Sequence, residues 1–136
     1  MSEDLKKHFN ELSSALMDLH KDLLMLEAKA LEAKQGKKLT PYELLNATLN
    51  DPSLAWLRRM SELIVSIDTV IDETENLSAQ DSHRVANEVL TVLEKPAGEA
   101  DNPFWTKYSE YLATDPDIIM RHSHVKMVIE KIRPVM

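Results

Sequence analysis

The side chains best suited to chemistry in this sequence are four aromatic residues near its C-terminal end. Phe104, Trp105, Tyr108 and Tyr111 fall within "NPFWTKYSEYL" and make up four of the seven aromatic residues in the chain. Residues three and four apart share a helix face, so these four should lie on one broad face of a short helix. Trp and Tyr are enriched at binding hot spots and in pocket walls. The face is therefore either a binding surface or a lid whose aromatic rings close one end of a bundle.

Two arginines and a histidine lie beside apolar helix faces. Arg59 borders the apolar arc that contains Trp56, Arg121 projects inside the arc of the last helix, and His122 lies at that arc's edge. A buried arginine must be paired, unless its alkyl stem carries the charge out to water. The alternative is that the arginines, His122 and the aromatic face converge on one anionic or aromatic ligand. The candidate ligand- or partner-binding residues are Trp56, Arg59, Phe104, Trp105, Tyr108, Tyr111, Arg121 and His122.

Catalytic and metal-binding patterns are missing from the sequence. A di-iron bundle needs Glu three residues before a ligating His, but the residues at that position are Leu5, Met17, Gln80, Ile119 and Arg121. There is no cysteine, and two glycines cannot build a phosphate-binding loop. We therefore expect no metal, no cofactor and no catalytic residues, and an enzyme is the less favoured interpretation.

The first of the elements that must position these residues is a long N-terminal helix. Leucines and Phe9 recur in steps of four and three from Leu5 to Ala30, the spacing of a bundle helix. Gly36 should end the helix, which at about 32 residues makes a rod of roughly 48 Å. A second row, Met17, Leu24 and Leu31, repeats every seven residues and predicts contact with a second neighbour.

Capping residues and prolines divide the rest of the chain into further helices. Thr40-Pro41 and Asp51-Pro52 start two of them, and Asn102-Pro103 and Asp115-Pro116 start two more, because proline fits the first helical turn but not the interior. Ser78 caps another. The predicted helices span 41–50, 52–73, 79–93, 103–113 and 116–133, with Pro134 ending the last.

These elements predict an all-α fold in a single domain over 1–136. It is an antiparallel four-helix-bundle-like domain with about six helices, because two long elements are broken at Asp-Pro joints. The helix after Ser78 is much shorter than the other three long elements, so one bundle end is left uncovered. We expect the short helices 41–50 and 103–113 to fold over that end and a homodimer to bury the remainder.

Composition limits the possible partners. The chain is 43% hydrophobic and 29% charged, as in globular proteins, and its net charge of −7 argues against nucleic acid. The start, "MSEDLKKHFNEL", does not resemble a signal peptide, and no apolar run reaches the roughly 20 residues of a membrane span. We expect a cytoplasmic protein without a membrane partner.

The sequence thus favours a non-catalytic helical module that binds a protein partner or itself, most simply as a homodimer. The alternative is a bundle that binds a small molecule in an aromatic-lined pocket at one end.

Overall fold

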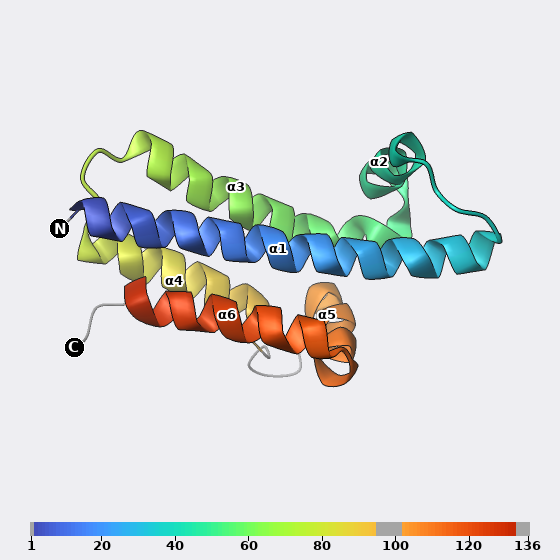
Figure 1. Ribbon diagram of the computed structural model, residues 1–136. Coiled ribbons are helices and arrows are strands. Elements are labelled where there is room, and N and C mark those ends of the chain that lie inside the picture. Colours follow the sequence, from blue (N-terminus) through green and yellow to red (C-terminus); the bar gives the residue numbers. More distant parts are fainter. Residues whose placement is uncertain (1, 95–101, 133–136) are drawn as a thin grey trace.

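The computed structural model describes residues 2–94 and 102–132 and contains only helices within them (Figure 1). The elements are α1 (Ser2–Gln35), α2 (Pro41–Asn50), the 3-10 helix η1 (Pro52–Leu57), α3 (Arg58–Glu73), α4 (Ala79–Leu93), α5 (Pro103–Thr114) and α6 (Pro116–Ile132). The all-α prediction is confirmed. The predicted end of the last helix at Arg133 and Pro134 lies outside the described residues.

α1 is the central rod in Figure 1 and packs against α3 on one side and α6 on the other. The fourth long helix, α4, packs against α3 and α6 and completes the bundle. The apolar faces of these helices meet in one core cluster to which every element contributes. The largest fully buried side chains are Phe9, Leu12, Leu16, Leu19, Leu23, Leu54, Met60, Ile67, Leu93, Tyr108, Ile118 and Ile129.

Helix boundaries follow the predicted caps. Thr40 and Glu43 form a reciprocal capping box at the start of α2, and Ser78 and Asp81 form one at α4. The Asp51 side chain accepts the N–H of Ser53, and Asn102 accepts that of Trp105. Gly36, with φ of 75°, takes the left-handed conformation that ends α1. The local signals in the sequence are therefore sufficient to place the breaks.

Two details differ from the sequence prediction. The helix expected from Pro52 opens with a 3-10 turn, in which residues three apart align, so Leu54 and Leu57 are buried together before α3 begins. In α1 the core row ends before Ala30, which is exposed, and Met17 of the second row is exposed in the middle of the helix. The C-terminal end of α1 projects past α5 in Figure 1, where the other long helices do not cover it.

The two short helices take different positions. α5 crosses the end of the α4 and α6 pair and also contacts η1, so it covers one end of the bundle as expected. α2 instead stands beside the projecting end of α1 and packs chiefly on η1 (Figure 1). None of the helices in the described residues is long and apolar enough to cross a membrane.

Candidate functional site

The aromatic residues of α5 join Trp56 of η1 in a continuous ring cluster. The centroid of Trp56 lies 5.4 Å from Phe104 and 6.4 Å from Tyr111, nearly parallel to the latter at 19°. Tyr108 lies 5.3 Å from Phe104 and 6.2 Å from Trp105. These separations are typical of favourable aromatic pairs. The sequence-predicted aromatic residues are thus brought together, with their rings turned inward on the bundle end.

Glu27 of α1 provides the polar anchor of this cluster. Its side chain is buried and accepts a hydrogen bond of 3.2 Å from the indole Nε1 of Trp56. Burial, together with the nearby Glu27 carboxylate, raises the pKa of Tyr111 to about 12. A buried carboxylate that receives donors from another element fixes the position of that element. Glu27 therefore ties η1 to α1, beside Tyr111 of α5.

A second polar contact joins α5 to α6. The hydroxyl of Tyr108 lies 2.6 Å from Nδ1 of His122. Burial raises the pKa of Tyr108 far above its usual range, while burial, helped by Lys126, lowers the pKa of His122. Both groups are therefore neutral at pH 7, and the tyrosine O–H donates to the imidazole. His122 thus fixes the hydroxyl of Tyr108, and with it the aromatic cluster, against α6.

Arg121 belongs to a different part of the molecule. Its guanidinium bonds Asp22 of α1 at 2.9 Å (Nε to Oδ2) and lies 3.6 Å from Asp18. The side chain is about one-third exposed, so it is paired and also reaches water. Arg59 lies instead in a pocket with Trp56 and Phe104. The two arginines serve separate sites, because Asp18 and Asp22, one helical turn apart, hold Arg121 against α1.

The pocket that contains Arg59 opens between η1, α3, α4 and α5 and has a volume of about 410 Å³. Trp56, Phe104 and Val92 form its buried apolar floor. The polar residues on its walls are Arg58, Arg59, Glu62, Thr91 and Asn102. An apolar floor with a few polar groups at the edge is typical of small-molecule sites.

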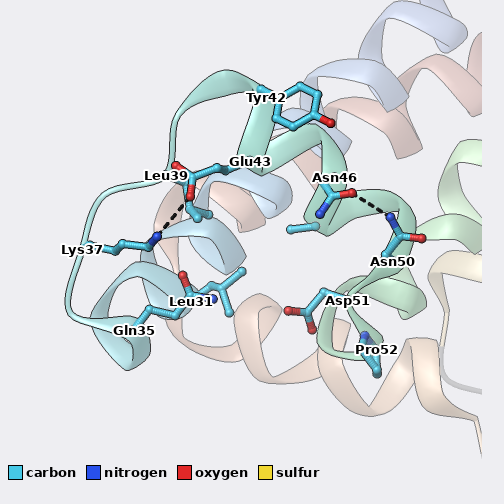
Figure 2. A pocket seen from close by; sticks show the side chains of 11 residues that line it. Leu31, Gln35, Lys37, Leu39, Tyr42, Glu43, Asn46, Asn50, Asp51 and Pro52 are labelled. Atoms are coloured by element: carbon cyan, nitrogen blue, oxygen red, sulfur yellow. Dashed lines mark hydrogen bonds and ion pairs between the residues drawn. The ribbon is translucent and has the colours of Figure 1, made fainter.

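A larger pocket, of about 660 Å³, lies between the end of α1 and α2 (Figure 2). Leu31 and Gln35 of α1 face it from one side, and Asn46 and Asp51 turn towards it from the other. At its edge the Lys37 ammonium pairs with Glu43 at 3.2 Å. The turn before α2 is held by Glu32, whose carboxylate accepts the N–H of Leu39 at 2.7 Å. The hollow exists because α2 is held at its two ends and does not pack along α1.

A third, apolar hollow of about 290 Å³ lies on the other side of α2, in the groove between α1 and α3. Leu24, Leu49, Leu54 and Leu57 line it, with Arg58 and Thr48 also on its wall. His20 and Ser61 also line the hollow, and a hydrogen bond of 3.1 Å between them crosses the groove. Burial lowers the pKa of His20, so this contact is made by the neutral imidazole at pH 7.

The outer face of α2 was not singled out by the sequence. Tyr42, Leu45 and Leu49 are 78%, 58% and 62% exposed. They are three and four residues apart and therefore lie on one helix face. The sequence feature that could have identified this face is its composition, since the ten residues of α2, "PYELLNATLN", contain a single charge.

No family model, no curated protein and no solved structure matches this chain. Residues 2–94 and 102–132 contain no group of three or more acidic or histidine side chains placed to hold a metal ion. The described residues offer two candidate surfaces: the pocket beside α5, lined by Trp56 and Phe104, and the exposed apolar face of α2.

Proposed function

We propose that this protein is a helical interaction module that forms a homodimer through the surface centred on α2. The observation that carries the proposal is the exposed apolar face of this helix, formed by Tyr42, Leu45 and Leu49. A short helix with large apolar residues in water and a hollow on each side gains stability when another surface covers it. Apolar patches of this kind are typical of protein–protein contacts.

The face of α2 continues along the groove between α1 and α3. Ser13 bonds Asp68 at 2.6 Å and His20 bonds Ser61 at 3.1 Å, which fixes the antiparallel register of the two helices. Met17 lies between Ser13 and His20 in the α1 row, and Val65 lies between Ser61 and Asp68 in the α3 row. Both are exposed. We refer to Tyr42, Leu45, Leu49, Leu24, Met17 and Val65 as the apolar stripe.

The arrangement of the stripe favours a second copy of the chain as the partner. Its α2 end stands beside the projecting end of α1 (Figure 1), whereas Met17 and Val65 lie along the groove between α1 and α3. A two-fold axis across the middle of the groove reverses the second stripe and places α2 of each copy over the groove of the other. In that arrangement α2 of each copy covers Met17 and Val65 of the other, which enlarges the contact beyond a single helix pair.

Sedimentation equilibrium with two matched variants tests this proposal. Leu49 and Met127 are both 62% exposed, but Met127 belongs to α6, across α1 from the stripe. We expect the wild-type chain to sediment at twice its 15.5 kDa mass. Leu49→Glu should be monomeric, because dimerisation would bury its charge, whereas Met127→Glu should remain dimeric. A wild-type monomer at high micromolar concentration, or equal effects of the two variants, would contradict the proposal.

A small-ligand function has separate support in the pocket of about 410 Å³ beside α5. It does not compete with self-association, because no residue of the apolar stripe lines this pocket, and the pocket shares only Arg58 with the apolar hollow beside α2.

A further inference from the structure

We infer that the pocket between η1, α3, α4 and α5 binds a small carboxylate with an apolar or aromatic body. This inference is independent of the proposed dimer. The pocket floor is apolar and preformed, because Trp56, Phe104 and Val92 are all buried and their remaining exposed surface faces the hollow. Its volume of about 410 Å³ lies within the usual range for small-molecule sites, roughly 300–1,000 Å³.

The orientation of Trp56 makes the floor a hydrocarbon surface. Its only polar atom, Nε1, donates to Glu27 of α1, away from the pocket lining. Phe104 and Tyr111 pack against the indole ring at centroid distances of 5.4 and 6.4 Å. The ring is therefore fixed before any ligand arrives, and little ordering of the floor is needed on binding.

The pocket wall supplies donors for a carboxylate. Arg58 uses its Nη2 atom to donate to the carbonyl of Leu49, whereas Arg59 makes no ion pair or hydrogen bond with any described residue. A guanidinium matches a carboxylate with two parallel hydrogen bonds. The Asn102 Oδ1 atom accepts the N–H of Trp105, which leaves the Nδ2 donor for a ligand. Arg59 and Asn102 are thus the groups that would hold the anion.

Glu62 limits the ligand charge. Its carboxylate lies on the same wall, one turn along α3 from Arg59. Two arginines and one glutamate on the wall leave a single net positive charge, which one carboxylate balances and a dianion such as a phosphate monoester would exceed. The chemistry therefore favours one negative charge on an apolar body. Either a free organic acid or the C-terminal apolar residue of a peptide presents this combination.

Fluorescence of Trp56 provides the test, in a Trp105→Phe background that removes the second indole. The probes are 3-phenylpropanoate for a free acid and Ala-Ala-Phe with a free C-terminus for a peptide, each beside its uncharged C-terminal amide. We expect a saturable change with at least one acid and binding at least about tenfold weaker for its amide, since a charged hydrogen-bond pair is lost. Binding of 3-phenylpropanoate identifies a free acid as sufficient, and binding of the peptide alone identifies a chain terminus.

Three variants in that background locate the binding. Arg59→Gln should weaken binding of the acid at least about tenfold, and Glu62→Gln should strengthen it. Arg84→Gln makes the same change of charge at an exposed position on α4 outside the pocket and should leave binding unchanged. Circular dichroism confirms that each variant keeps its helices. The inference is wrong if neither acid gives saturation up to about 10 mM, if acid and amide bind equally, or if Arg59→Gln and Arg84→Gln behave alike.

Discussion

α2 and α5 begin and end with the same local signals yet have different relations to the core. Each starts at a polar N-cap followed by proline, Thr40-Pro41 or Asn102-Pro103, and each ends at an Asp-Pro pair. α5 buries Phe104 and Tyr108, whereas the only buried residue of α2 is Ala47. Caps and prolines therefore determine where a helix begins and ends, and the size of its inward residues determines how firmly it packs.

The difference also separates two kinds of surface. α5 turns its aromatic rings inward, and what it leaves outside is the wall of a small pocket. α2 turns a small alanine inward and leaves Tyr42, Leu45 and Leu49 in water. An inward aromatic face stabilises the monomer, and an outward apolar face stabilises a complex. We therefore propose a ligand for the α5 region and a protein partner for α2.

The largest predicted contrast is between one aromatic residue from each helix. Phe104→Ala should lower the free energy of unfolding by about 3–5 kcal/mol, because it removes a buried ring from the cluster. Tyr42→Ala should change it by less than about 0.5 kcal/mol at concentrations where the chain is monomeric. Urea unfolding followed by circular dichroism measures both. Similar losses for the two variants would show that α2 is as firmly packed as α5.

An intermediate contrast concerns the two glutamates of α1 that hold these regions. Glu27→Ala should cost about 2 kcal/mol, because the buried Trp56 Nε1 donor loses its acceptor. Glu32→Ala should cost about 1 kcal/mol or less, because water can reach the Leu39 N–H that it releases. The same unfolding measurement applies. A larger loss at Glu32 would contradict the conclusion that the α5 region packs more firmly on the core than α2 does.

The smallest contrast is a pH dependence in the α5 region. Burial lowers the pKa of His122 below its usual 6.5, so the folded state binds fewer protons than the unfolded state below that pH. The contribution of neutral His122 to the free energy of unfolding is therefore fully present above pH 6.5, and it is lost as the pH falls from 6.5 through the folded-state pKa. His122→Gln, which can still accept from Tyr108, should show a smaller decline between pH 7 and 5. His124→Gln, at an exposed position, should follow the wild type, and a parallel decline in all three proteins would argue against His122 as the source.

The fold was largely predictable because its signals are local. Each signal lies within a short stretch of sequence: the core row of α1, the helix caps and the Asp-Pro breaks. The structure confirms the helices that these signals predict. The grouping of Trp56 with the α5 aromatic residues was also expected, since all of them lie on apolar helix faces.

The contacts between distant residues were not predictable. Arg121 pairs with Asp22, 99 positions away, and Trp56 bonds Glu27, so the register of the packed helices decides which charges meet. Periodicity gives the face of a helix but not its partner, which is why the sequence left open whether Arg121 and Arg59 meet in one site. The exposure of α2 depends likewise on where the end of α1 projects. No local pattern contains that information.

Site-directed cross-linking tests the central claim, a dimer through the apolar stripe, most directly. The natural chain has no cysteine, so Leu45→Cys and Val65→Cys each introduce a single thiol. Chains of the two variants, one carrying a mass tag, are mixed and treated with a short bismaleimide. The reversed stripes predict covalent dimers that contain one chain of each variant, in excess over dimers of either variant alone. An absence of mixed dimers, or equal cross-linking between two Leu45→Cys chains, would contradict it.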